Sequence, residues 1–123
     1  MTIIEIITDV DALKPNGLGQ PYKVQWLSQL DARIKHDIID THEGGEDVSF
    51  NGYNAETPIG TELLVPHPYD DVYRYWLEAQ IDYVNGEYTK YNNSMSMFNE
   101  AYSAYERHYN RTHMPKGNSL KFF

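Results

Sequence analysis

The sequence predicts an all-α fold of three to four helices, at about residues 2–13, 21–42, 69–91 and 94–112. Apolar residues recur at helical spacing near the N-terminus and again between residues 27 and 38. Between residues 77 and 109, apolar and aromatic residues alternate at intervals of four and three, which places one residue per turn on a single helix face. A chain of 123 residues can bury one hydrophobic core, so we expect a single helical domain over residues 1–123.

The first helix is expected over residues 2–13. Thr2 and Glu5 form a capping-box pattern directly before an apolar run. Isoleucine and valine, which dominate this run, also favour strands. The run stops at Lys14-Pro15-Asn16-Gly17, because proline cannot continue the helical hydrogen-bond ladder and Asn-Gly turns easily.

The second helix is expected to begin near Pro21, because proline suits the first helical turn. Trp26 lies beside its buried stripe, which consists of Leu27, Leu30, Ile34 and Ile38. The helix is expected to end at about residue 42, before Gly44-Gly45.

Residues 43–67 contain glycines and prolines that break any periodicity. Two short apolar pieces, Val48 to Tyr53 and Glu62-Leu63-Leu64-Val65, could pair as a β-hairpin. A connection this long inside a small domain favours a functional or partner-binding loop, and a partly disordered loop is the alternative.

The third helix is expected from residue 69, where Asp70 and Asp71 suit the positive end of the helix dipole. Two weak points follow, Asn85-Gly86 and Asn92-Asn93-Ser94. Because the periodicity keeps its phase across both, the alternatives are one kinked helix or two helices. One continuous rod would be long for so small a domain. We therefore expect a break or kink within residues 85–94.

Nine of the eleven tyrosines lie between residues 69 and 109. Tyrosine has a large apolar ring and a polar tip, and it is favoured at protein–protein contacts. The aromatic residues point in several directions from the same segment, so their surface exceeds what one helix face can bury. We expect a subunit interface formed by Tyr73, Trp76, Tyr83, Tyr88, Tyr91, Tyr102, Tyr105 and Tyr109.

The net charge of −8 is concentrated in residues 1–62, which hold eleven acidic against four basic residues. Nucleic-acid binding needs clustered lysine and arginine, so this charge argues against it and suits a surface past which DNA slides. No apolar run approaches the roughly 20 residues that span a bilayer. The acidic start does not match a signal peptide. The lack of cysteine excludes disulfides and thiolate metal sites.

Catalytic patterns are missing from the sequence. None of the five histidines stands at the convergent spacing of a zinc site. The sequence contains no phosphate-binding glycine loop and no nucleophile elbow. We therefore expect a non-enzymatic protein without catalytic residues, cofactor or metal. A metal-dependent hydrolase using His42, His67 and Asp70 ranks third among the functions considered.

Most of the chain resembles small proteins encoded in phages and prophages of Gram-positive bacteria. The segments that carry the likeness are Val10-Asp11-Ala12-Leu13-Lys14-Pro15-Asn16, Thr61-Glu62-Leu63-Leu64-Val65-Pro66-His67-Pro68-Tyr69-Asp70-Asp71, Leu77-Glu78-Ala79-Gln80-Ile81-Asp82-Tyr83-Val84-Asn85-Gly86-Glu87, Tyr91-Asn92-Asn93-Ser94-Met95 and Tyr109-Asn110-Arg111-Thr112-His113-Met114-Pro115-Lys116. The family it looks like is that of head–tail connectors, the head-completion adaptors in the neck of long-tailed phages.

The resemblance implies a helical subunit that forms a homo-oligomeric ring beneath the phage portal protein, with DNA passing through the centre without specific binding. It also implies a terminal arm that grips the portal and a loop that faces the channel or the next neck or tail-completion protein. By this analogy the arm is the flexible segment 114–123, and the portal-binding residues are Arg111, His113, Met114, Pro115, Lys116, Leu120, Phe122 and Phe123. The channel residues are Glu43, Glu46, Asp47 and Glu56.

The expected location is therefore the neck of the virion, after assembly in the cytoplasm of the bacterial host. The second function considered is that of another tail-completion or minor capsid-associated phage protein.

Overall fold

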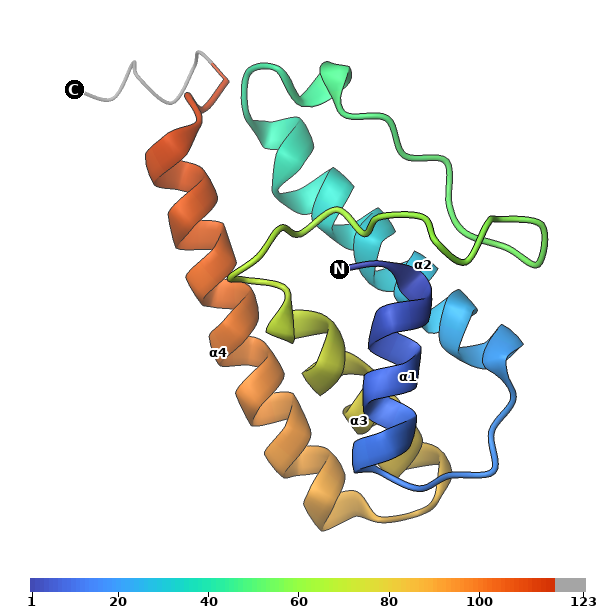
Figure 1. Cartoon of the computed structure of the whole chain (residues 1–123). Coiled ribbons are helices and arrows are strands. Elements are labelled where there is room, and N and C mark those ends of the chain that lie inside the picture. Colours follow the sequence, from blue (N-terminus) through green and yellow to red (C-terminus); the bar gives the residue numbers. More distant parts are fainter. Residues whose placement is uncertain (117–123) are drawn as a thin grey trace.

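The computed structural model describes residues 1–116 and contains four α-helices and two short 3₁₀ helices (Figure 1). The α-helices are α1 (Ile3–Leu13), α2 (Gln20–Asp37), α3 (Asp71–Val84) and α4 (Tyr88–Thr112). The 3₁₀ helices η1 (Ile39–Thr41) and η2 (Gly45–Asp47) follow α2. The prediction of an all-α fold is confirmed.

The first helix starts as its capping box predicts. The side chain of Thr2 accepts a hydrogen bond from the amide of Glu5 at 3.3 Å, and the amide of Thr2 donates to the Glu5 carboxylate at 2.9 Å. The helix ends at Lys14, whose backbone is extended. The amine of Lys14 then donates to the carboxylate of Asp82 at 2.7 Å, which connects the end of α1 to α3.

The second helix has Pro21 in its first turn, as expected, but it ends at Asp37 and not near residue 42. The hydroxyl of Thr41 donates to the carbonyl of Ile38 at 2.7 Å, and Nδ1 of His42 lies 2.6 Å from the same oxygen. These side chains occupy the carbonyl that a continuing helix would pair with a backbone amide. The chain tightens into η1 as a result.

A turn at residues 85–87 separates α3 from α4, which form a helical hairpin (Figure 1). The break lies within the predicted 85–94 interval, so α3 ends before residue 91 and α4 begins before residue 94. Gly86 has a φ of 73°, which glycine adopts without a steric cost. The second weak point is inside α4, where the hydroxyl of Ser94 donates to Asp82 at 3.1 Å.

The expected β-hairpin in the long loop is wrong, because residues 1–116 contain isolated bridges and no strand. Residues 59–63 pair through their backbone with the N-terminal residues, and no backbone hydrogen bond joins them to residues 48–53. The amides of Ile3 and Ile4 donate to the carbonyls of Thr61 and Ile59 at 3.1 and 2.9 Å. The N-terminal residues therefore provide the backbone partners that the hairpin would have provided.

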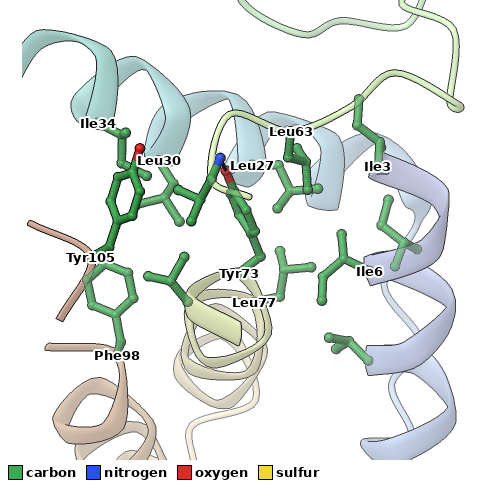
Figure 2. Packing of buried hydrophobic residues seen from close by; sticks show 14 of the residues in the cluster. Ile3, Ile6, Leu27, Leu30, Ile34, Leu63, Tyr73, Leu77, Phe98 and Tyr105 are labelled. Atoms are coloured by element: carbon green, nitrogen blue, oxygen red, sulfur yellow. Dashed lines mark hydrogen bonds between the residues drawn. The ribbon is translucent and has the colours of Figure 1, made fainter. Parts of the chain in front are cut away.

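The core forms where α3 contacts each of the other three α-helices. Tyr73 and Leu77 of α3 lie at its centre (Figure 2). Figure 2 shows around them Ile3 and Ile6 of α1, Leu27, Leu30 and Ile34 of α2, Phe98 and Tyr105 of α4, and Leu63 of the loop. Within residues 1–116, no helix combines the length and apolar character needed to cross a membrane.

Candidate interaction surface

The helical hairpin divides the predicted subunit interface into buried and exposed residues. The periodic residues 77–109 are split between two helices that face each other, so much of their apolar surface packs inside the chain. Tyr73, Tyr105 and Tyr109 are buried there. Assigning these three to a subunit interface is wrong, because they belong to the core and offer no surface to a second copy.

Trp76 and Tyr102 are half-buried and pack on Phe98, with ring centroids 5.1 and 5.6 Å from it. The indole N–H of Trp76 donates to the carbonyl of Trp26 at 2.9 Å. These two predicted interface residues therefore contribute mainly to the packing of α2, α3 and α4.

The remaining tyrosines of the prediction gather at the turn between α3 and α4. We call this surface the aromatic end and define it as Tyr83, Val84, Tyr88 and Tyr91. Tyr83, Val84 and Tyr88 are 57%, 54% and 60% exposed. The ring of Tyr83 lies edge-on to those of Tyr88 and Tyr91, with centroids 5.7 and 5.4 Å apart. Exposed aromatic rings that contact one another form a continuous surface suited to protein contact.

Charged residues beside the aromatic end are paired with one another. Lys14 lies 2.7 Å from Asp82, and Lys90 lies 3.1 Å from Glu87. A partner that covers the rings would therefore meet ion pairs and not single charges.

A groove of mixed polarity lies between the start of α3 and the middle of α4. Its volume is about 350 Å³, and its lining combines the apolar or aromatic residues Tyr69, Tyr75, Met97, Ala101 and Ala104 with the acidic residues Asp71 and Glu100. Met97 is exposed there. The α3–α4 hairpin therefore presents apolar surface at its turn and a partly apolar groove along its side.

The C-terminal segment is docked on the chain as far as residue 116. The amide of Glu43 donates to the carbonyl of Met114 at 2.8 Å, and the amide of Lys116 donates to the carbonyl of Thr41 at 3.0 Å. The ring of His113 stacks on Tyr109 with centroids 3.8 Å apart. We call residues 113–116 the C-terminal strap.

The prediction that a flexible arm begins at residue 114 is wrong, because the C-terminal strap is docked on the chain. Backbone pairing with residues 41–43 holds Met114, Pro115 and Lys116 in place, although the side chain of Met114 is exposed. Arg111 is also exposed, on the last turn of α4. The other predicted arm residues lie outside the described part of the chain and are Leu120, Phe122 and Phe123.

The predicted channel residues are all exposed, but they lie in two places. Glu43, Glu46 and Asp47 are at or beside η2, where Lys35 donates to the carbonyl of Gly45 at 3.0 Å. Glu56 belongs to a separate turn that begins at Asn54 and is held by a 2.8 Å hydrogen bond from its amide to the Asn54 side chain.

The structure does not bring together the three residues of the metal hypothesis. His42 is buried, and its nitrogens lie 2.6 Å from the Ile38 carbonyl and 2.8 Å from the side-chain oxygen of Asn110. His67 lies near Asp70, with its nitrogen 3.4 Å from the carboxylate. Residues 1–116 contain no group of three or more histidine or acidic side chains placed to hold a metal ion.

A buried carboxylate that sequence reasoning missed organises the long loop. Asp31 of α2 is 0% exposed. Its oxygens accept hydrogen bonds from the hydroxyl of Tyr73 at 2.6 Å, the hydroxyl of Tyr53 at 2.5 Å and the amide of Leu64 at 3.1 Å. One side chain therefore fixes both α3 and two points of the loop to α2.

The electrostatics of this site follow from its burial. Burial raises the pKa of Asp31, although the hydrogen bonds from the two tyrosines and Leu64 oppose the change. Burial and the neighbouring Asp31 carboxylate raise the pKa of Tyr73 and of Tyr53. The signal that could have found Asp31 is its spacing, since it stands four residues after Leu27 and three before Ile34, within the buried stripe.

Comparison with protein-family models, curated proteins and solved structures found no match to this chain.

Proposed function

We propose that the chain is a structural subunit of a phage neck, a head–tail connector that forms a ring around the DNA exit path. Its partners in this role are further copies of itself, the portal protein, and the next neck or tail-completion protein. The support comes from the resemblance of its sequence segments to that family and from its all-α architecture. The role places the chain in the virion neck after assembly in the host cytoplasm.

The observation that carries the proposal is the aromatic end. A ring needs a contact repeated from copy to copy between two different patches of the subunit. Tyr83, Val84 and Tyr88 provide one exposed apolar patch whose neighbouring charges are already paired. The groove along the α3–α4 hairpin, which is partly apolar and bordered by Asp71 and Glu100, provides a second and different surface.

The exposed acids fit the same role. Glu43, Glu46, Asp47 and Glu56 carry their charge on the surface, where it would repel the phosphates of a passing duplex. The arm residues Arg111 and Met114 are also accessible, which supports a portal contact at this end of α4.

The test compares ring formation by three proteins. The double variant Tyr83→Ser/Tyr88→Ser removes the centre of the aromatic end. Tyr22→Ser is the matched control, because Tyr22 is also 57% exposed but lies on α2. We expect cryo-microscopy and sedimentation velocity to show rings of the parent chain and the control, formed alone at high concentration or on the portal.

The double variant should keep its helical circular dichroism and lose the rings. Rings that persist in the double variant would remove the aromatic end from the interface. A parent chain that stays a single copy both alone and with the portal would contradict the connector role itself.

A further inference from the structure

The chain contains three Asn-Gly pairs, Asn16-Gly17, Asn51-Gly52 and Asn85-Gly86. This dipeptide is the one most open to spontaneous deamidation, because glycine has no Cβ to shield its backbone nitrogen. The three pairs share the same local chemistry, and each follows a bulky residue. Differences in their reactivity in the folded chain must therefore come from the structure.

The reaction needs only water. The backbone nitrogen of the glycine loses its proton and attacks the side-chain carbonyl carbon of the asparagine. A C–N bond forms, the bond from that carbon to the amide nitrogen breaks, and ammonia leaves. Water then opens the resulting succinimide ring at either carbonyl, giving aspartate or isoaspartate without any oxidation or reduction.

The side chain of Asn16 is held in place. Its nitrogen donates to Asp11 at 3.1 Å and to the carbonyl of Lys14 at 2.9 Å. Its oxygen accepts from the amide of Leu18 at 3.1 Å. All three hydrogen bonds oppose the rotation that would bring its carbonyl carbon to the nitrogen of Gly17.

At Asn85-Gly86 the attacking atom, the backbone nitrogen of Gly86, already donates a hydrogen bond. The amide of Gly86 donates to the carbonyl of Tyr83 at 3.1 Å, and the amide of Asn85 donates to Ile81 at 3.0 Å. The glycine nitrogen must leave the end of α3 before it can attack. One such hydrogen bond contributes about 1 kcal/mol, which lowers the reactive population about fivefold.

Asn51-Gly52 lacks both kinds of protection. Asn51 is exposed, and within residues 1–116 neither its side chain nor the backbone N–H of Gly52 has a hydrogen-bond partner. We propose that Asn51 is a site of spontaneous deamidation in the folded protein, and that its conversion precedes that of Asn16 and Asn85.

The product would change how the long loop is anchored. Isoaspartate adds a methylene to the backbone two residues before Tyr53. The amide of Tyr53 donates to Ser28 at 2.9 Å, and its hydroxyl donates to Asp31. Lengthening the backbone directly before Tyr53 displaces its amide from Ser28 and its hydroxyl from Asp31. Either product also adds a negative charge to an already acidic loop.

The experiment incubates the purified full-length chain at mildly alkaline pH and follows each Asn-Gly peptide by mass spectrometry. Deamidation raises the mass by about one dalton, and chromatography separates aspartate from isoaspartate. The matched control is the same chain in denaturant, where the three pairs should convert at similar rates. The variant Asn51→Gln should remove the fast phase and keep the fold. We avoid Gly52→Ala because Gly52 has a φ of 86°.

In the folded chain we expect Asn51 to convert at least about fivefold faster than Asn85, the factor set by one hydrogen bond, and Asn16 to be slowest. Conversion of Asn85 or Asn16 ahead of Asn51 in the folded chain would overturn the proposal. An Asn51 that stays intact while the denatured chain converts all three pairs would do the same.

Discussion

The hydroxyl of Tyr73 lies between Asp31 and Val65, donating to the carboxylate at 2.6 Å and accepting from the amide of Val65 at 2.7 Å. All three residues are buried. Their hydrogen bonds replace those that the same polar groups make to water in the unfolded chain, so none of these groups is buried without a partner. The attachment of the loop to the helices therefore depends on a polar network inside the core.

Asp31→Asn should reduce the free energy of unfolding by about 1–3 kcal/mol. The asparagine amide has one acceptor oxygen where the carboxylate has two, so at least one donor loses its partner. Urea unfolding followed by circular dichroism measures the change. Asp37→Asn, at an exposed position on the same helix, is the control and should have little effect. An Asp31→Asn variant as stable as the parent would show that the network contributes nothing net.

The same variant should change the response to acid. Because burial raises the pKa of Asp31, the folded chain holds this proton more tightly than the unfolded chain. The contribution of Asp31 to stability is therefore greatest below its ordinary value of 3.8 and declines as pH rises through the raised pKa. The stability advantage of the parent over Asp31→Asn should be larger at acid pH than at neutral pH. An advantage that grows with pH would contradict this sign.

Buried tyrosines predict a loss of stability in alkali. Burial raises the pKa of Tyr73 and Tyr105 above the ordinary value of 10.0. Above that pH the unfolded chain loses these protons while the folded chain keeps them, so stability falls by up to about 1.4 kcal/mol per pH unit for each. Denaturant unfolding at a series of alkaline pH values measures the slope. Tyr105→Phe should make it shallower, and an unchanged slope would exclude Tyr105 as a contributor.

Truncation should separate the strap from the residues after it. Ending the chain after Thr112 removes three backbone hydrogen bonds, made by His113, Met114 and Lys116, together with the stacked ring of His113, and should cost about 2 kcal/mol of stability. Ending it after Lys116 keeps these contacts and should leave the fold intact while weakening portal attachment. Denaturant unfolding and a portal pull-down measure the two effects. Equal stability of the two truncations would show that the strap is not part of the fold.

Charge reversal tests the surface past which DNA would slide. The parent chain should not bind duplex DNA. Replacing Glu43, Glu46, Asp47 and Glu56 together by lysine should create binding that weakens with salt, because phosphate contacts release counterions. Replacing the same four by neutral amides is the control and should not bind. Fluorescence anisotropy measures all three, and tight binding by the parent chain would favour a nucleic-acid-binding function.

Sequence periodicity located the helices, and local side-chain chemistry decided where they end. The capping box at Thr2 is a short-range pattern, so the start of α1 could be read directly. The end of α2 depends on Thr41 and His42 competing for the carbonyl of Ile38, which no periodicity reports. The false hairpin has a similar cause, since residues 59–63 pair with the N-terminus, about 60 residues away in sequence.

The interface prediction failed where it depended on tertiary packing. Tyr105 and Tyr109 share the residue type and the helical spacing of Tyr88, yet they are buried while Tyr88 is exposed. The difference arises because the chain reverses at Gly86, which turns one continuous helical face into two facing ones. A pattern of residues cannot say which side of a turn a second helix will cover.

The Asp31 network also constrains how this chain can evolve. When the carboxylate, which accepts from two hydroxyls and one amide, is replaced alone, at least one of these donors is left without an acceptor. Relatives that lose the acid at position 31 should also change the side chain at position 53 or 73, whose hydroxyls donate to it. The three positions are thus expected to change together over evolutionary time, although the sequence separates them by about 20 residues each.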